Sequence, residues 1–350
     1  MTEIKRESEG APRLGSTTQI DVARRAGVST ATVSRVLNGS PLVSATAREK
    51  VEAAIRDLAY LPHEAARSLA MRRSRTLGAI IPTLTNAIFA TGVNAFEEEA
   101  RARGHALFIA VSNYDPVQEG FLIRQMVERG VDGLLLVGND RAEDSRAMLA
   151  ATGLRCACAW AYDEAATIAN VGFDNAEAMA PVVDHLVGSG RRRVAVLAGV
   201  LAGNDRARAR LDGTVRRLGE HGLAPIAVAE TRYSIRRAKE AARELLTLRP
   251  DALVCGNDVI AFGALSAARA AGRRVPDDVA ITGVDDLPIS AEVDPPLTTV
   301  RIPAEEMGRR AAAELIAAIR EDRPVAPIRL GTRLVVRRSS WRPPTGGTAR

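Results

Sequence analysis

A chain of 350 residues is long enough to form two or three domains with sizeable cores. Its hydrophobic content of 46% and charged content of 26% are ordinary for a soluble globular protein. Three cysteines are too few, and odd in number, for a disulfide framework, which favours a reducing compartment. Residues 1–17 lack the apolar core of a signal peptide, and no window approaches the apolar run of a membrane helix. We therefore expect a cytoplasmic protein without a membrane partner.

The excess positive charge lies at the N-terminal end of the chain. Residues 1–75 contain 13 Lys and Arg against 8 Asp and Glu, a net charge of +5. Residues 76–350 contain 35 against 34, a net charge of +1. A polyanion is the natural partner of such a basic segment.

Residues 18–38 predict two short helices joined by a tight turn, after a polar tail over residues 1–16 that we expect to be disordered. Gly27 can adopt the positive φ that such a turn needs. Thr18 and Ser29 are natural N-caps for the two helices. The spacing is typical of a helix-turn-helix, whose second helix presents its first residues to the base edges of DNA.

A third helix, from about Ala45 to Leu58 with Ser44 as its N-cap, completes a small helical domain over residues 17–61. We call this domain the headpiece. Residues 62–75 form a predicted hinge, in which residues 63–70 favour a helix of barely two turns. Because a helix that short is marginal alone in water, we expect it to order only when it docks on a partner.

Residues 76–341 show alternating strand and helix patterns. Apolar runs occur at Leu77–Ile81, Ala106–Val111, Val131–Val137, Val194–Leu197, Ala252–Cys255 and Val279–Val284. Helical stretches occur at Phe89–Arg103, Phe121–Arg129, Glu177–Gly188, Arg206–His221, Ile235–Leu246 and Ile260–Ala271. The alternation predicts two doubly wound parallel sheets in two similar lobes, with a ligand cleft at the carboxyl ends of the strands. Residues 342–350 are expected to be a disordered tail.

Several short motifs, in order along the chain, resemble the LacI/GalR family of bacterial transcription regulators over residues 17–341. They are the segment 21–38, Ala-Ala-Arg-Ser-Leu-Ala at 65–70, Val-Asp-Gly-Leu-Leu-Leu at 131–136, Gly-Phe-Asp-Asn at 172–175, Gly-Asn-Asp at 256–258, Gly-Val-Asp-Asp at 283–286 and Pro-Pro-Leu-Thr-Thr-Val at 295–300. The resemblance implies an all-α headpiece and a two-lobed core similar to periplasmic sugar-binding proteins. It also implies a homodimeric repressor of a pseudo-palindromic operator, controlled by a metabolite that binds between the lobes.

The resemblance gives individual residues roles in DNA binding. Arg35 can donate two hydrogen bonds to guanine, Ala31 can touch a thymine methyl group, and Leu69 takes the position of the family's minor-groove wedge. The predicted DNA-contacting residues are Thr18, Ser29, Thr30, Ala31, Thr32, Ser34, Arg35 and Asn38 in the headpiece, and Ala66, Arg67 and Leu69 in the hinge. For Thr18 and Ser29, phosphate binding and helix capping remain open alternatives.

The same resemblance places the effector site between the lobes. The implied lining is Asn86, Phe89, Trp160, Asn204, Arg206, Arg210, Tyr233, Asn257 and Asp285. Trp160 departs from the aspartate of many sugar-responsive members and favours stacking, although it is also a candidate core residue. Arg206 and Arg210 share one helix face; they face either an acidic sugar or a carboxylate of Asp205, Asp212 or Glu240.

Other classes of function find less support in the sequence. No phosphate-binding glycine loop is present, and Cys156 and Cys158 lack further ligands for zinc, so we expect no enzyme activity, cofactor or metal. A sugar-binding protein of a transport system is the alternative function, since the core has that architecture. The basic headpiece argues against it.

Overall fold

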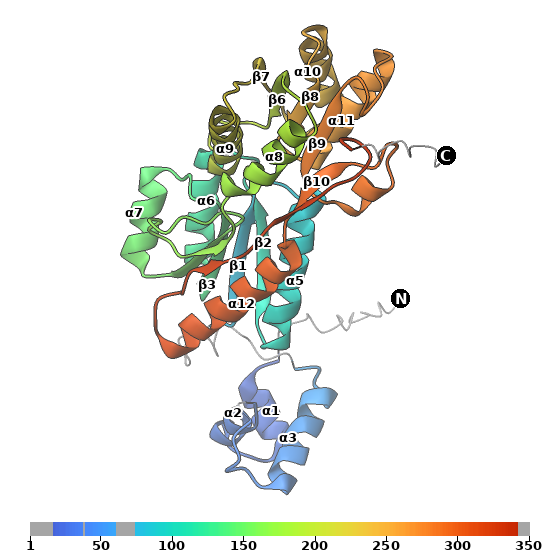
Figure 1. Ribbon diagram of the computed structural model, residues 1–350. Helices are drawn as coiled ribbons and strands as arrows, with labels where there is room; N and C mark the ends of the chain where they lie inside the picture. Colours follow the sequence, from blue (N-terminus) through green and yellow to red (C-terminus); the bar gives the residue numbers. More distant parts are fainter. Residues whose placement is uncertain (1–16, 38, 61–73, 342–350) are drawn as a thin grey trace, which may run out of the picture. The chain divides into compact units, whose positions relative to one another are not determined.

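The computed structural model describes residues 17–37, 39–60 and 74–341 (Figure 1). The chain divides into two compact units, residues 1–74 and residues 75–350. The predicted DNA contacts Asn38, Ala66, Arg67 and Leu69 lie outside the described residues, as do the two predicted tails and most of the hinge.

The N-terminal unit contains the three predicted helices, α1 (Gln19–Ala26), α2 (Thr30–Leu37) and α3 (Ala45–Asp57). Thr18 forms a capping box at α1: its hydroxyl accepts a hydrogen bond from the amide of Asp21, whose carboxylate accepts the Thr18 amide at 2.9 Å. Gly27 ends α1 with a φ of 67°, which confirms the predicted tight turn.

The core of this unit is small and made of apolar side chains from all three helices. Val22, Val33, Val51 and Tyr60 are buried together. The amide side chain of Gln19 donates to the carbonyl of Thr30 at 3.2 Å and ties α1 to the start of α2. One face of α2 is thereby fixed against the core, which leaves the opposite face to solvent.

The larger unit contains two six-stranded sheets. The first sheet has the order β11-β5-β4-β3-β1-β2, and we call it and its helices the first lobe. In chain order, its elements are β1 (Thr76–Ile81), α5 (Ala87–Ala102), β2 (Ala106–Val111), α6 (Pro116–Glu128), β3 (Gly133–Val137), α7 (Glu143–Thr152), β4 (Arg155–Ala159), β5 (Asn170–Gly172), α12 (Ala304–Glu321) and β11 (Ile328–Arg329).

The second sheet has the order β12-β10-β9-β8-β6-β7 and forms the second lobe. Its elements are η1 (Glu177–Met179), α8 (Ala180–Gly188), β6 (Val194–Ala198), α9 (Asp205–Glu220), β7 (Ala227–Glu230), α10 (Ile235–Thr247), β8 (Ala252–Cys255), α11 (Asp258–Ala270), β9 (Ala280–Asp285), η2 (Pro288–Ala291), β10 (Thr298–Arg301) and β12 (Arg333–Val335). All strand pairs are parallel except β10 with β12. The predicted pair of doubly wound sheets is confirmed.

The two lobes are not formed by two separate halves of the chain. After β10, the chain returns to the first lobe, where α12 packs against α5 and β4 and where β11 joins β5. It then crosses back to add β12 to the second sheet. The chain therefore passes between the lobes after β5, after β10 and after β11.

Two helices begin three or more residues from the predicted start, whereas α5, α9 and α11 begin within two residues of it. Helix α6 begins at Pro116 rather than Phe121, because Asp115 caps it and proline suits the first helical turn. The helix expected from Glu177 starts as the 3₁₀ turn η1, and regular α-helix begins only at Ala180. Pro181 explains the break, since it has no amide hydrogen to donate to the carbonyl four residues earlier.

Central strands of both sheets are buried on both faces, as expected for parallel sheets covered by helices. The three cysteines are free and buried in strands of the two sheets. Within the described part of the chain, none of the helices combines the length and the hydropathy needed to cross a bilayer.

Candidate functional site

The exposed face of α2 carries the residues predicted to read DNA bases. Thr30, Ala31 and Arg35 are exposed, while Val33 and Val36 on the opposite face are buried. The guanidinium of Arg35 makes no hydrogen bond or ion pair with any described residue. Helix α2 therefore presents two small side chains to solvent at its start and a cationic donor in its last turn, which lies further along the helix than the predicted position near the start.

The hydroxyls of the predicted phosphate-binding residues already serve the headpiece itself. Thr18 forms the capping box of α1, and the Ser29 hydroxyl accepts the amide of Thr32 at 3.1 Å as the cap of α2. The Ser29 and Thr32 hydroxyls also lie 2.9 Å apart. Thr32 and Ser34 are half-buried. The capping alternative thus holds for Thr18 and Ser29, while their phosphate contacts stay a prediction.

The structure brings all nine predicted effector residues to one cavity between the two lobes. Its lining is Asn86, Ile88, Phe89, Tyr114, Trp160, Asn204, Arg206, Arg210, Tyr233, Asn257 and Asp285. These residues follow the carboxyl ends of strands from both sheets, where parallel sheets bind ligands. The cavity volume is about 20 Å³, which is room for about one water molecule.

Three helices begin at this cavity, and an asparagine caps each of them. The Asn86, Asn204 and Asn257 side chains accept backbone amides at the first turns of α5, α9 and α11. A helix N-terminus carries a partial positive charge and unpaired amides. The cavity is therefore surrounded by donors that suit hydroxyl or anionic groups of a ligand.

Trp160 fills much of the space between the lobes. It is only 2% exposed, and its ring meets Phe89 edge-on with the centroids 5.1 Å apart. Its φ of 60° is rare for a residue with a large side chain. The indole Nε1 is buried without a hydrogen-bond partner among the described residues. Trp160 is thus both a packed core residue and part of the cavity wall.

The two tyrosines of the cavity stack on each other. The rings of Tyr114 and Tyr233 lie 5.2 Å apart at an angle of 23°, and Asn204 donates to the Tyr233 hydroxyl at 2.9 Å. Burial raises the pKa of both phenols, so both remain neutral donors. Tyr114 therefore covers one face of the Tyr233 ring.

Arg206 and Arg210 have different surroundings although they share one face of α9. Arg206 pairs with Asp205 at 2.8 Å, as the ion-pair alternative proposed. Arg210 instead donates to the Asn175 side chain at 2.8 Å and to the carbonyl of Gly256 at 2.7 Å. In the described part of the chain it pairs with neither Asp212 nor Glu240, the latter being engaged by Arg236 and Arg237. Arg210 thus keeps its positive charge without a carboxylate partner.

Asp285 ends β9 at the cavity with a φ of 131°, a strained conformation for any residue other than glycine. Asn257 donates to its carboxyl group at 3.4 Å. Burial raises the pKa of Asp285 well above its ordinary value, and the nearby Arg210 only partly offsets this rise in pKa. The neighbouring Asp286 points elsewhere and pairs with Arg301 and Arg337, as expected for adjacent residues at a strand end.

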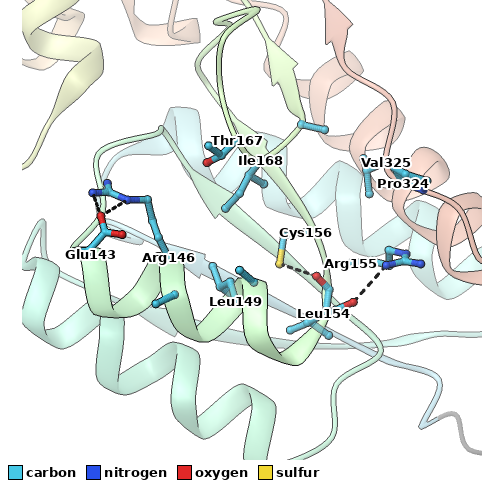
Figure 2. A pocket seen from close by; sticks show the side chains of 14 residues that line it. Glu143, Arg146, Leu149, Leu154, Arg155, Cys156, Thr167, Ile168, Pro324 and Val325 are labelled. Carbon is cyan, nitrogen blue, oxygen red and sulfur yellow. Dashed lines mark hydrogen bonds and ion pairs between the residues drawn. The ribbon is translucent and has the colours of Figure 1, made fainter.

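A larger groove of about 540 Å³ lies within the first lobe (Figure 2). It is bounded by α7, β4 and the segment after α12, with Leu149, Ile168 and Val325 among its apolar residues. Of its charged residues, Glu143 and Arg146 pair with each other at 2.5 Å, and Arg155 pairs with Asp322 at 3.0 Å. The small cavity between the lobes has the converging polar groups that this groove lacks, so it is the better candidate for a specific ligand.

The prediction missed two residues of the cavity, Ile88 and Tyr114. Tyr114 follows the carboxyl end of β2, so the rule that ligands bind at strand ends points to it. Ile88 lies between two predicted residues on the first turn of α5 and has no distinguishing chemistry.

Comparison with known proteins agrees with this architecture. Residues 18–63 match the lacI family of bacterial regulatory proteins, and residues 183–340 match the periplasmic binding protein-like domain. The HTH-type transcriptional regulator GntR of Pseudomonas aeruginosa is 34% identical over 321 residues, which cover 90% of this chain and 93% of that protein. The repressor CytR of Escherichia coli is 32% identical and covers 85% and 89%.

Solved structures give the same result. The Lac repressor dimer bound to operator and the anti-inducer ONPF has a TM-score of 0.84 and 29% identity, and the match covers 93% of this chain and 99% of that one. The CelR–cellobiose complex has a TM-score of 0.69 and 30% identity, with 93% and 100% covered. With its helix-turn-helix, its two-lobed core and these matches along nearly its whole length, the chain belongs to the lacI family of bacterial regulatory proteins.

Proposed function

We propose that this protein is a repressor that binds a pseudo-palindromic operator as a homodimer and changes its DNA affinity when a small molecule binds between the lobes. The observation that carries the proposal is the pairing of an exposed α2 face with a donor-lined cavity in one chain. The relatives named above are transcriptional regulators and repressors. Nothing in the cavity favours a catalytic role over a binding role.

For DNA recognition, we assign the base contacts to the exposed face of α2. Arg35 donates to guanine, Ala31 touches a thymine methyl group, and Thr30 offers a methyl group or a hydroxyl. Thr18, Ser29, Thr32, Ser34 and Asn38 set the register on the phosphates. In the hinge, Leu69 acts as an apolar wedge in the minor groove, with Ala66 and Arg67 beside it.

For the effector, we propose a sugar or sugar derivative. The cavity offers amide, phenol and guanidinium donors, with the stacked tyrosines and Trp160 as apolar walls. Among structural relatives, CelR was solved with cellobiose and the Lac repressor with ONPG or ONPF. Arg210, which donates to an amide and a carbonyl rather than to a carboxylate, favours a derivative with an acidic group.

For assembly, we propose that two copies meet through the exposed apolar edges of both lobes. In the first lobe, Phe108 and Ile109 lie on the edge strand β2, and Phe121 lies on α6. In the second lobe, Val228 lies on the edge strand β7. Exposed apolar edge strands invite pairing or burial against another chain. The Lac repressor relative is a dimer, which supports a second copy of this chain as the occupant.

The function is tested by DNA binding of the purified full chain to the region upstream of its own gene. We expect a sequence-specific, salt-dependent shift that changes when an effector is added. A thermal-shift screen of sugars, sugar acids, sugar phosphates and purines identifies candidate effectors beforehand. The proposal is contradicted if the protein binds the upstream region and a scrambled sequence equally well in the presence of every candidate effector.

A further inference from the structure

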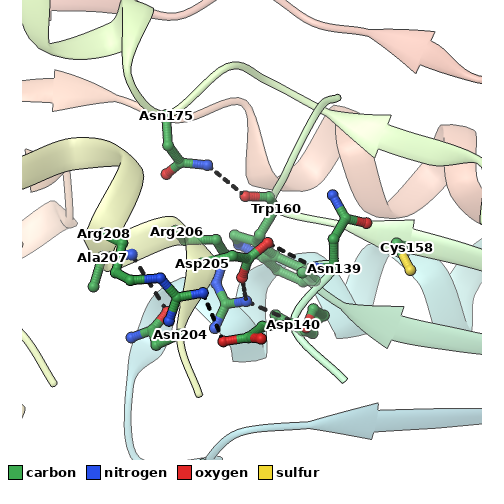
Figure 3. A network of polar contacts seen from close by, with 12 residues as sticks. Asn139, Asp140, Cys158, Trp160, Asn175, Asn204, Asp205, Arg206, Ala207 and Arg208 are labelled. Atoms are coloured by element: carbon green, nitrogen blue, oxygen red, sulfur yellow. Dashed lines mark hydrogen bonds and ion pairs between the residues drawn. The ribbon is translucent and has the colours of Figure 1, made fainter. Parts of the chain in front are cut away.

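The two lobes touch through a set of polar contacts beside the cavity (Figure 3). On the first lobe, the contacts come from residues 137–140, the end of β3 and the turn that follows. On the second lobe, they come from Asp205, Arg206 and Arg208 in the first turn of α9. Strand β3 belongs to the first lobe and helix α9 to the second. Any separation of the lobes must therefore break these contacts.

Each of the three α9 residues reaches across the gap. The Asp205 carboxylate accepts the backbone amide of Asn139 at 2.7 Å. Arg206 donates to the carbonyl of Val137 at 3.2 Å. Arg208 pairs with Asp140 at 2.7 Å. The contacts thus combine backbone groups with one ion pair.

Gly138 allows this close approach. Its φ is 72°, and a Cβ at this position would overlap both the Arg206 guanidinium and the Asp205 carboxylate. A side chain at position 138 would therefore displace the ends of these two side chains from their contacts with the turn.

The turn itself is held firmly to the first lobe. The buried guanidinium of Arg141 donates to the carbonyl of Gly138 at 3.0 Å and pairs with Glu119 at 2.7 Å. Because these contacts fix the turn to the first lobe, the turn cannot follow α9 by itself when the lobes separate.

The contacts are coupled to the cavity through Arg206, which lines it. Arg206 also borders a pocket of about 400 Å³ on its other side, together with Asn139 and Asp205. The cavity of about 20 Å³ cannot hold a sugar, since small-molecule sites usually measure hundreds of cubic ångströms. A sugar-sized ligand therefore needs a wider cavity, and Arg206 forms the wall between this cavity and the larger pocket.

We propose that Asp205, Arg206 and Arg208, docked on the turn at Gly138, form a latch that holds the cavity shut in the ligand-free protein. The inference rests on the proposed ligand role of the cavity and describes how that cavity is regulated. Only molecules whose lobes have separated can bind ligand, so the apparent affinity is the intrinsic affinity multiplied by the fraction of molecules in that open state. A weaker latch therefore strengthens ligand binding without any new contact to the ligand.

The test compares Gly138→Ala with Gly222→Ala in the full chain. Gly222 has a φ of 70° with nothing within 4 Å of an added Cβ, so its variant has the same backbone strain without the clash. Spin labels on Asp144→Cys in α7 and Arg216→Cys in α9 report the distance between the lobes. The native cysteines are buried and do not compete for the label.

We expect longer and broader distances in ligand-free Gly138→Ala than in wild type or Gly222→Ala, and faster exchange of the Asn139 amide hydrogen. Identical distances and exchange in both variants overturn the latch. If Gly138→Ala does not fold, Asp140→Asn, which removes only the ion pair with Arg208, gives the same comparison against Glu128→Gln at the exposed end of α6.

A second readout uses the compound that most stabilises the wild type in the thermal-shift screen. Its apparent affinity should rise on the order of tenfold in Gly138→Ala and stay unchanged in Gly222→Ala. If no compound stabilises the wild type, the effector proposal fails, while the ligand-free distances still decide whether the latch exists.

Discussion

At the scale of single residues, Arg35 and Trp160 carry the two halves of the proposed function. Arg35 is exposed on α2 with no partner among the described residues, whereas Trp160 is among the most buried side chains of the core. A charged side chain that no intramolecular contact holds is available for a partner. A buried aromatic side chain instead sets the shape of the space around it.

Replacing Arg35 with alanine should weaken operator binding by about 1–3 kcal/mol and relax specificity at one base position. Arg35→Lys keeps the charge but not the paired donors, so it should lose that discrimination while retaining salt-dependent non-specific binding. Titrations of an operator series with each base pair replaced in turn measure both effects. Equal losses on all sequences would assign Arg35 to phosphate instead.

Replacing Trp160 with alanine should destabilise the core by about 3–5 kcal/mol, because the lost contacts leave a cavity between the lobes. Urea unfolding followed by circular dichroism measures the change. Trp341→Ala is the matched control, since Trp341 is 45% exposed and its loss should change stability little. Similar losses for the two variants would show that Trp160 does not support the core.

Asp285 should make stability depend on pH. The folded protein retains the Asp285 proton above pH 3.8, where the unfolded chain loses it, so this residue's contribution to stability falls as pH rises toward the raised pKa. Asp285→Asn should therefore gain stability relative to wild type on going from pH 4 to pH 8, by about 1.4 kcal/mol for each unit of pKa shift. Thermal melts across this range test it, with Asp144→Asn as control. If the stability difference between Asp285→Asn and wild type is the same at every pH, Asp285 does not have a raised pKa.

At the scale of elements, the clear signals in the sequence were caps and periodicity. Ser44, Thr18 and Gly27 fixed the limits of the headpiece helices closely, because capping chemistry acts within one turn. Strands β1, β2, β3, β6, β8 and β9 were predicted from their apolar runs, whereas the runs did not include β4, β7 and β10. The short strands β5, β11 and β12 span two or three residues, too few for any periodic pattern.

The site was predictable in a different way. The identity of its residues came from the resemblance to a family, and strand ends explain why they converge. The latch was not predictable, because Gly138, Asp205 and Arg208 are ordinary loop and helix residues until two distant turns meet. The stacking of Tyr114 on Tyr233 was missed for the same reason, since it joins residues from different lobes.

The capping box of α1 is the feature of the headpiece that can be tested most directly. Thr18→Ala should lower the stability of the headpiece helices by about 1 kcal/mol, because it removes the cap. Thr18→Gly keeps most of the stability, because glycine is also a good N-cap, but it has no hydroxyl, so DNA binding should still weaken if the Thr18 hydroxyl donates to phosphate. Hydrogen exchange of α1 and DNA affinity separate the two roles. Unchanged DNA affinity in Thr18→Gly would leave capping as the only role of Thr18.

At the scale of the whole molecule, the proposed dimer links the two units to an operator with two half-sites. Ile109→Asp should place a charge in the interface on β2 and shift the protein to monomers in sedimentation experiments. Operator affinity should fall with it, because each headpiece then binds alone. Val215→Asp on the exposed side of α9 is the control. A dimer that persists in Ile109→Asp would place the interface elsewhere.

The route of the chain between the lobes also has a consequence for synthesis on the ribosome. The first lobe lacks its edge strand β11 and the cover of α12 until residues near Arg329 have emerged, long after the headpiece is free. At about 5–20 residues per second, the apolar surface that α12 covers stays open for many seconds. A nascent chain of this protein should therefore need chaperone protection late in translation, and a premature stop before α12 should leave an insoluble product rather than a small DNA-binding fragment.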